Sequence, residues 1–174
     1  RSIPQEAGLK TWLNWSGEAS VAVATPLDGE GLAAARLYTF LPMAAEARSP
    51  SFAHLDAPFF TNISRRLARL DLPLNAYLLD AAAEVAASEA LRLTSSDLIA
   101  PRCVVDLAAW SADQRGRLSS AFAKCGTSLA EAPVWPTTAK AWCGLASLRS
   151  WPQEPFKVFT AARATRAGAA NILS

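Results

Sequence analysis

Residues 59–93 read FFTNISRRLARLDLPLNAYLLDAAAEVAASEALRL, and most of what the sequence predicts follows from this stretch. An apolar segment is followed by a loop that carries Arg65 and Arg66, and then by an Ala- and Leu-rich run. The run starts near Pro73, which suits a first helical position because proline has no N–H to leave unbonded there. Apolar residues then recur near the 3.6-residue period, so residues 73–92 are predicted to form a helix with one buried face. We therefore expect a charged loop held between two rigid elements.

The composition allows one ordinary globular core or two small lobes. The chain has 174 residues, of which 51% are hydrophobic and 18% are charged, so it is neither disordered nor fibrous. Its formal net charge is only +2 and its arginines are spread along the chain, so nucleic acid is not the expected partner. No apolar run reaches the ~18 residues needed to span a bilayer, and a soluble, cytoplasmic protein without a membrane partner is predicted.

The cysteines do not indicate a metal site. Cys103, Cys125 and Cys143 are an odd number without C-x-x-C spacing, and the single histidine, His54, has no cysteine beside it in the sequence. We expect no bound metal, and instead free thiols in a reducing compartment.

Strands are predicted on the N-terminal side of the helix. Residues 20–25 and 34–41 contain β-branched and aromatic residues, and the segment between them contains Asp28 and Gly29, a pair typical of hairpin loops. We expect these two segments to form an antiparallel pair and residues 52–60 to add another strand. The predicted fold class is α/β (mixed α+β), with a small mixed sheet and covering helices.

A lapse of the helical pattern at residues 94–101 predicts a boundary between two lobes, residues 1–96 and residues 97–174. The second is expected to be a small α/β lobe that is truncated at its C-terminus, because residues 161–173 read as a helix without a clear cap. The sequence also lacks an initiator Met. We therefore expect a domain cut from a longer protein.

Further elements are predicted in the second lobe. They are a helix at residues 112–124 with Ser111 and Gln114 as a capping box and Gly126 as its C-cap, an extended segment at residues 132–135, a helix at residues 138–148 capped by Thr138, and a strand at residues 155–160. The six tryptophans are not interleaved with basic residues, so we expect them to anchor the core or the interface between lobes.

No complete active site can be assembled from the residues, and it stays open whether the chain is part of an enzyme. The glycine cluster at residues 29–31 lies between two predicted strands rather than at the start of a helix, which favours a plain turn over a nucleotide loop. A serine hydrolase would have to use His54, yet no G-x-S-x-G sequence accompanies it. The spacing of Asp56, Asp71 and Asp80 does not single them out as paired acid–base residues.

Arg65 and Arg66 allow two interpretations. A guanidinium fork clamps phosphate, and it stabilises the charge of a transferring phosphoryl group when a loop delivers it to another domain's nucleotide. The alternative is a surface pair that is bonded to Asp56, Asp71 or Glu84. The spacing by itself favours this second interpretation.

Three segments resemble a known family. They read ARLYTFLPM at residues 35–43, SFAHLDAPFFTNISRR at residues 51–66 and LPLNAYLL at residues 72–79. In this order they are similar to the segment that follows the ATP-binding fold in sacsin-type proteins. These belong to the GHKL superfamily, together with the ninety-kilodalton heat-shock chaperone, gyrase B and MutL. The sequence that enters the helix also resembles the chaperone's middle domain, although Leu78 stands where that family has a phosphate-contacting arginine.

The resemblance implies a middle or transducer domain of a bacterial sacsin-like or chaperone-like ATPase, with a first lobe of the ribosomal-protein-S5-domain-2 kind. ATP and Mg²⁺ would be bound by a preceding domain of the same chain, because the motifs of the nucleotide pocket are missing here. The implied partners are that ATP-binding domain, a client protein and a second copy in a homodimer. Arg65, Arg66, Asn62 and Asn75 are the implied phosphate-sensing residues, with no catalytic residue and no metal ligand assigned.

Two other functions stay open at this point. One is a protein-interaction module that uses its Trp-rich second lobe and has no tie to ATP. The other is a free-standing hydrolase that uses His54.

Overall fold

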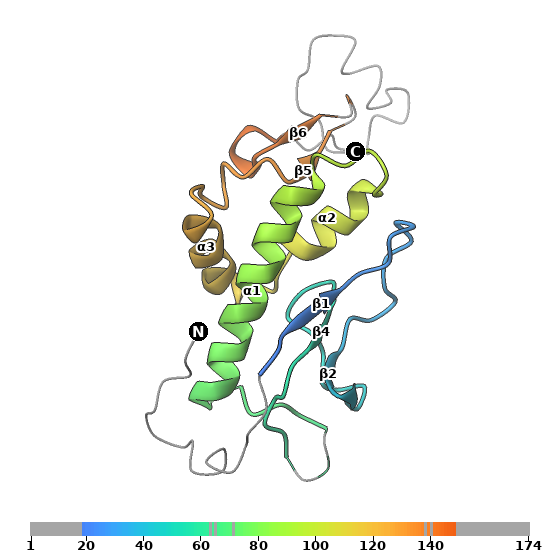
Figure 1. Cartoon of the computed structure of the whole chain (residues 1–174), viewed down its shortest axis with the longest axis vertical. Coiled ribbons are helices and arrows are strands. Elements are labelled where there is room, and N and C mark those ends of the chain that lie inside the picture. The colour runs from blue at the N-terminus through green and yellow to red at the C-terminus, as the bar shows by residue number, and fades with distance from the viewer. Residues whose placement is uncertain are drawn as a thin grey trace, which may run out of the picture.

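The computed structural model describes residues 19–62, 64, 66–70, 72–137, 139 and 141–148. Within them the chain forms three α-helices, a four-stranded sheet and a separate two-stranded sheet (Figure 1). In chain order the elements are β1 (Ala22–Ala24), β2 (Leu37–Thr39), β3 (Leu41–Pro42), β4 (His54–Asp56), α1 (Pro73–Leu93), α2 (Pro101–Ala108), α3 (Arg115–Lys124), β5 (Trp135–Pro136), β6 (Trp142–Cys143) and a 3-10 turn, η2 (Leu145–Ser147). The predicted mixed α/β fold class is confirmed at this level.

The long helix α1 lies between α3 on one side and α2 and the sheet on the other (Figure 1). It was expected to start at Pro73 and it does, with proline in its first turn. Its buried face is built mainly from small side chains, and Ala82, Ala86 and Ala90 are wholly inaccessible to solvent. Small residues at a helix contact allow the neighbouring elements to approach closely. The buried alanines of α1 therefore let it pack closely against its neighbours α2, α3 and β1.

Two ion pairs tie α3 along α1. Arg117 of α3 pairs with Asp80 of α1, and the same guanidinium donates to the carbonyl oxygen of Ala76 at 3.0 Å. Lys124 Nζ lies 2.5 Å from Glu84 Oε1. The acidic residues that stand off the apolar stripe of α1 therefore fix the position of its neighbour.

The sheet has the strand order β1-β4-β2-β3. β1 pairs antiparallel with β4, β4 pairs parallel with β2, and β2 pairs antiparallel with β3. The predicted strand at residues 52–60 is confirmed as the short β4. The predicted strand at residues 34–41 is divided at Phe40 into β2 and β3. The antiparallel pairing expected between residues 20–25 and 34–41 is wrong, because β4 lies between β1 and β2.

The loop after β1 attaches to α2 instead of forming a tight hairpin, which explains this error. Thr25 Oγ1 donates to Asp106 Oδ2 at 3.3 Å, and Cys103 Sγ donates to the carbonyl oxygen of Pro26 at 2.7 Å. The central place in the sheet is taken by β4, whose Leu55 is fully buried. An apolar side chain is buried most completely on a strand that has a neighbouring strand at both edges, and this burial stabilises the fold.

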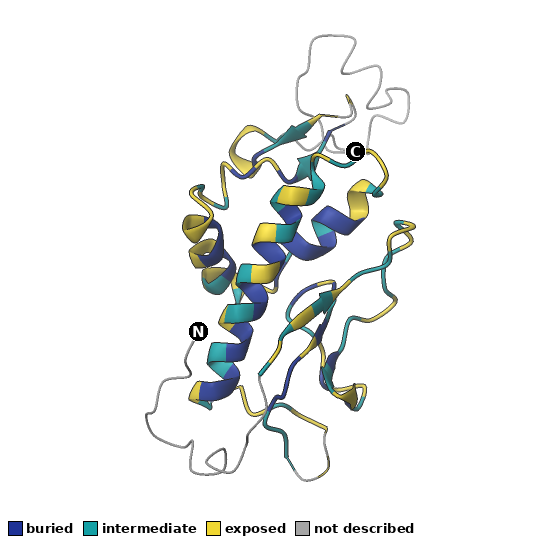
Figure 2. Ribbon diagram, viewed as in Figure 1, coloured by how far each residue is buried: buried dark blue, intermediate teal, exposed yellow. Residues whose placement is uncertain are grey.

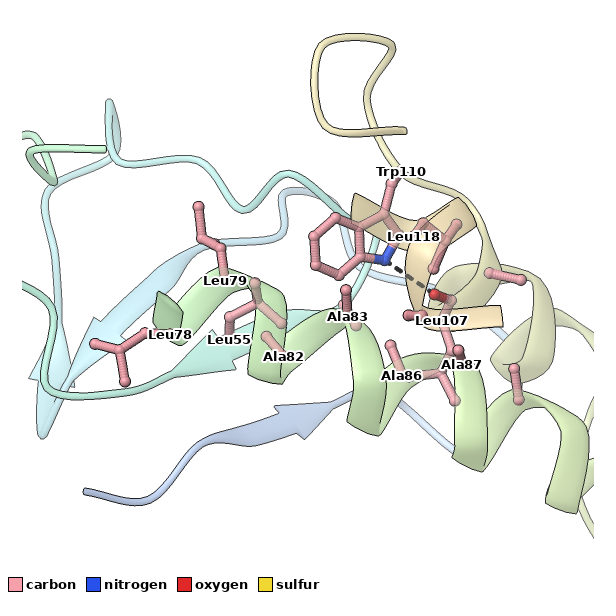
Figure 3. Packing of buried hydrophobic residues seen from close by; sticks show 14 of the residues in the cluster. Leu55, Leu78, Leu79, Ala82, Ala83, Ala86, Ala87, Leu107, Trp110 and Leu118 are labelled. Carbon is pink, nitrogen blue, oxygen red and sulfur yellow. Dashed lines mark hydrogen bonds between the residues drawn. The ribbon is translucent and has the colours of Figure 1, made fainter. Parts of the chain in front are cut away.

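One cluster of buried residues extends from the sheet through α1 to the β5 strand. Figure 3 draws Leu55 of β4 near Leu78, Leu79 and Ala82 of α1. Trp110, which lies between α2 and α3, and Leu118 of α3 pack toward the later turns of α1. Buried positions on α2 face the same interior (Figure 2). The lobe boundary predicted near Asp97 falls in the turn between α1 and α2, and the buried cluster continues across it.

The helix predicted at residues 112–124 is confirmed, but it starts at Arg115. The predicted capping box is wrong: Gln114 is the N-cap, and no side chain bonds the free N–H groups of this helix end. The predicted C-cap is confirmed, because Gly126 has a φ of 84° and donates to the Ala123 carbonyl at 3.0 Å. Thr127 donates to the Phe122 carbonyl at 3.2 Å, which completes a Schellman motif.

The helix predicted at residues 138–148 is wrong. This segment instead forms β6, which pairs antiparallel with β5, and then η2. Gly144 explains the difference, since a Cβ added there would stand 2.5 Å from the carbonyl oxygen of Ala130. The Ala146 N–H also donates to that oxygen at 2.9 Å. Tertiary contact with residues 130–131 therefore overrides the local helical preference of the segment.

Several predictions fall on residues outside the described ranges. They are the cap at Thr138, the strand at residues 155–160 and the helix at residues 161–173. Within the described residues, no helix is both long enough and apolar enough to cross a membrane.

Candidate functional site

The residues implied to sense phosphate lie on or beside one loop, which we call the arginine hairpin (residues 60–69). Thr61 and Ala68 form an antiparallel bridge one residue in from its base. At its base the Arg69 N–H donates to the Phe60 carbonyl oxygen at 2.9 Å. Residues 60–62 and 67–69 are therefore paired as the two arms of a hairpin.

Asn62 closes the tip of the arginine hairpin. Its N–H donates to the Leu67 carbonyl oxygen at 3.1 Å, and its side-chain Oδ1 accepts the N–H groups of Arg66 at 2.9 Å and Leu67 at 3.4 Å. Asparagine side chains commonly bond backbone N–H groups in this way at turns. Asn62 therefore fixes the backbone from which the Arg66 side chain extends.

Arg66 is exposed, and among the residues that the structure describes no carboxylate pairs with its guanidinium. Two of the three acidic partners considered from the sequence are engaged elsewhere. Asp56 accepts a backbone N–H from the β2–β3 turn, and Glu84 is paired with α3. The third, Asp71, lies outside the described residues, as does Arg65.

Asn75 anchors the base of the arginine hairpin to the first turn of α1. It is fully buried, and its Oδ1 accepts the Phe60 N–H at 2.8 Å. Its Nδ2 donates to the carbonyl oxygens of Phe60 and Arg69, both at 2.8 Å. Because the oxygen and both hydrogens of the amide are engaged, the structure gives Asn75 the role of a positioning residue for the hairpin.

His54 lies in β4 and holds the neighbouring strand. Its Nδ1 accepts the Arg36 N–H at 3.0 Å, which puts the ring proton on Nε2. Its ring meets the Tyr38 ring edge-on, with centroids 5.1 Å apart. The hydroxyl of Ser51, close by in the sequence, donates to the Ala53 carbonyl and not to the imidazole. Within the described residues, the pairing that a serine hydrolase needs is therefore not formed.

Asp106 of α2 is a buried charged residue that was not predicted from the sequence. The side chain of Asp106 is 1% exposed, and its Oδ1 lies 2.6 Å from Arg102 Nε. Its second oxygen accepts the Thr25 hydroxyl, so the carboxylate joins α2 to the loop after β1. The four-residue spacing of Arg102 and Asp106 was the available signal, but no helix had been predicted there.

Cys103 lies beside this ion pair. Burial raises the pKa of its thiol above the ordinary value of 9.0, and the charge of Asp106 raises it further. The thiol is therefore uncharged near neutral pH, which makes it a packed side chain and not a nucleophile.

Three of the tryptophans can be placed. Trp110 is buried and its Nε1 donates to the Leu107 carbonyl at 3.1 Å, while Trp135 and Trp142 are half-buried against the core cluster. These positions confirm the core-anchor interpretation for these three. The others, Trp12, Trp15 and Trp151, lie outside the described residues.

The described ranges contain no group of three or more His, Cys, Asp or Glu side chains placed to hold a metal ion. No protein-family model, curated protein or solved structure matches the chain. The likeness to the GHKL superfamily therefore rests on the three sequence segments.

Proposed function

We propose that this chain is a coupling domain that delivers an arginine of the arginine hairpin to an anionic group held by a neighbouring domain. The observation that carries the proposal is a contrast within the hairpin. Its backbone is bonded at the tip by Asn62 and at the base by Asn75, whereas the Arg66 side chain extends without a carboxylate partner among the described residues. A guanidinium on a fixed backbone binds phosphate with little loss of chain entropy.

The anionic group is the γ-phosphate of ATP bound, with Mg²⁺, by a preceding domain of the sacsin-like or heat-shock-chaperone-like GHKL kind. The three resembling segments support this step because they form one contiguous unit. Residues 35–43 make β2 and β3, residues 51–66 make β4 and most of the hairpin, and residues 72–79 open α1. A first lobe of the ribosomal-protein-S5-domain-2 kind belongs to the same proposal.

In this function the arginine stabilises charge that develops on the phosphoryl group during ATP hydrolysis. Such a residue acts only when the two domains close, so hydrolysis becomes coupled to their relative position. The domain itself then holds no complete catalytic site, and Asn75 serves by fixing the base of the hairpin. The coupled movement would act on a client protein or on closure of a homodimer.

ATP turnover by the full-length protein tests the proposal. Arg66→Ala is expected to lower kcat on the order of 10³-fold, as removal of an arginine finger does. Arg66→Lys keeps the charge but loses the planar fork, so it is expected to restore only part of the rate. Arg65→Ala is measured separately, because the resemblance does not distinguish the two arginines.

Arg92→Ala is the matched control for this experiment. Arg92 is also an exposed arginine, but it lies in the last turn of α1 and pairs with Glu89. Its replacement is expected to leave kcat unchanged. Turnover that is unaltered in both Arg65→Ala and Arg66→Ala would contradict the proposal.

Calorimetric titration of the isolated chain with Mg-ATP gives a second test. No tight binding is expected, because the proposal places the nucleotide pocket in the preceding domain. A complex with micromolar or lower Kd would show that this chain holds the nucleotide itself, and the coupling role would be wrong.

A further inference from the structure

Arg36 and Arg48 stand directly opposite each other on neighbouring segments of the chain, where they form an isolated antiparallel bridge. Two backbone hydrogen bonds enclose the bridge, Leu37 N–H to the Ala47 carbonyl at 3.0 Å and Ser49 N–H to the Ala35 carbonyl at 3.1 Å. A bridge enclosed in this way is a non-hydrogen-bonded pair, the kind in which the two side chains lie closest to each other. Like charges directly opposite are destabilising, so the fold holds these two arginines together at a cost in free energy.

Both arginines lie on the face of the sheet that is turned away from the core. Leu37 and Ala47, their neighbours in the sequence, are buried in the core cluster, whereas Arg36 is half-buried and Arg48 is exposed. Successive side chains of an extended segment point to opposite faces, which accounts for this alternation. Among the described residues, no carboxylate forms an ion pair with either guanidinium. The two positive charges are therefore available to a ligand on this outer face.

His54 of β4 adds a hydrogen-bond donor on the other side of Arg36. The imidazole lies beside Arg36, because its Nδ1 accepts the Arg36 N–H at 3.0 Å and Leu55 N–H donates to the Arg36 carbonyl at 3.1 Å. The ring proton is then on Nε2, which can donate to a further acceptor. The edge-on contact with Tyr38 fixes the ring. Arg48, Arg36 and His54 thus stand side by side across three adjacent segments, and they are called the outer-face row below.

The donors of the outer-face row match a phosphate monoester. This group carries a charge of about −1.5 to −2 at neutral pH and oxygens that accept several hydrogen bonds, and guanidinium groups bind it well. A carboxylate would neutralise only one of the two arginines. Asp56 is exposed on the same face of β4, two residues after His54, and its charge disfavours an extended polyanion such as nucleic acid. We propose that the outer-face row binds the phosphate group of a small phosphate monoester.

This site is separate from the arginine hairpin. Because β2 and β4 run parallel, Arg36 before β2 and His54 at the start of β4 lie at the same end of the two strands. The arginine hairpin follows the other end of β4, and Asn75 ties it to α1. The inference therefore does not depend on the proposed coupling function, and either can fail without the other.

Titration of the ¹⁵N-labelled chain with inorganic phosphate at pH 7 and constant ionic strength, followed by NMR, tests the site. Saturable shift changes are expected at the backbone amides of Arg36 and Leu55 and at the His54 ring, and glycerol phosphate should give the same pattern. Acetate is the matched anion and should leave these signals in place. Equal changes with acetate, no changes with phosphate, or changes confined to residues 60–69 would overturn the inference. Tighter binding of a single-stranded DNA oligonucleotide than of glycerol phosphate would also overturn it.

Arg36→Gln and Arg48→Gln are each expected to weaken phosphate binding about 10-fold, because each removes a hydrogen-bond donor that carries charge. Arg92→Gln is the matched control, since Arg92 is an exposed arginine that pairs with Glu89 on α1, and binding should be unchanged. His54→Asn keeps an acceptor for the Arg36 N–H but loses the Nε2 donor, so it is expected to weaken binding while the urea midpoint is retained. Binding that is unaltered in both Arg36→Gln and Arg48→Gln would contradict the site.

Urea unfolding shows whether the arginine pair serves the fold instead. Without phosphate, Arg48→Gln is expected to unfold at the same or a higher urea concentration, because the repulsion between the facing charges is relieved. Phosphate should raise the midpoint of the wild-type chain more than that of Arg48→Gln, since a ligand that binds the folded state stabilises it. A lower midpoint for Arg48→Gln without phosphate would show that the pair stabilises the fold, and the ligand site would be wrong.

Discussion

Asn75 holds both backbone groups of Phe60: the Phe60 N–H donates to Asn75 Oδ1 and the Phe60 carbonyl accepts from Asn75 Nδ2, each at 2.8 Å. A single side chain on α1 thus bonds the strand end from outside the hairpin, in addition to the Arg69 N–H that donates to the same Phe60 carbonyl at 2.9 Å. The strand end, the arginine hairpin and the helix become one unit. The position of Arg66 relative to α1 depends on this contact.

Asn75→Ala is expected to destabilise the chain by about 3 kcal/mol, because it removes the three hydrogen bonds that this fully buried side chain makes to Phe60 and Arg69. Urea unfolding followed by circular dichroism measures this. Asn62→Ala is the matched control, since it removes an amide from the exposed tip of the same hairpin and is expected to cost about 1 kcal/mol. Asn75→Asp keeps the acceptor oxygen but loses both amide donors. Near-normal stability of this variant would contradict the stabilising role of the two Nδ2 hydrogen bonds.

Gly144→Ala is expected to destabilise the chain by about 2 kcal/mol, because the new methyl group would overlap the backbone of Ala130 and Glu131. Gly116→Ala provides the contrast. A Cβ added at Gly116 meets no atom within 4 Å, and alanine is the better helix former at this position in α3. The midpoint temperature of thermal unfolding should therefore fall for Gly144→Ala and rise for Gly116→Ala. A shift in the same direction for both variants would contradict the close contact at Gly144.

Arg102→Met is expected to cost about 2 kcal/mol, because it leaves the buried carboxylate of Asp106 without its charged partner. Arg102→Met combined with Asp106→Leu should recover part of that loss, since the unpaired charge is then gone. Arg92→Met breaks an exposed pair and is expected to leave the unfolding midpoint unchanged. Equal effects of Arg102→Met and Arg92→Met in urea titrations would show that burial of Asp106 is unimportant.

Because the thiol of Cys103 is buried, the folded chain is expected to lose stability in alkaline solution. Burial raises its pKa in the folded chain, so the contribution of the neutral thiol is complete below the unfolded pKa and is lost as pH rises through the folded one. The free energy of unfolding should therefore fall above about pH 9. Cys103→Ala should show a smaller decline in urea midpoints measured from pH 7 to pH 10.

Alkylation by iodoacetamide checks the same thiol independently. Cys125 is exposed and Cys103 is buried. Mass spectrometry at pH 8 is expected to find rapid modification of Cys125 and modification of Cys103 only after urea is added. Equal rates in the folded chain would contradict the burial.

Much of the local structure followed from residues close together in the sequence. Pro73 and the 3.6-residue apolar period were sufficient to predict α1, and Gly126 was sufficient to predict the end of α3. The residues of the proposed site, which the resemblance singled out, also stand within one short stretch: the paired arginines, Asn62 and Asn75. The sequence did not show that these residues differ in exposure: Asn75 is buried and positions the hairpin, whereas Arg66 is exposed.

The errors concern contacts between distant segments. α2 was not predicted, although Pro101 stands at its start, because its eight residues carry too short a pattern to distinguish from a loop. The strand order was wrong because β4 enters the sheet between β1 and β2. Phe40 was predicted to lie within the strand at residues 34–41, since no glycine marks the turn that it makes.

The sequence by itself determined where α1 begins, where α3 ends and which short stretch carries the arginines, because each depends on interactions within a few residues. Only the tertiary structure decided which strands are neighbours, that the loop after β1 binds α2, and that Asn75 is occupied by Phe60. These contacts join residues 15 to 81 positions apart. Their free energy comes from burial and hydrogen bonding that exist only once the whole core has formed.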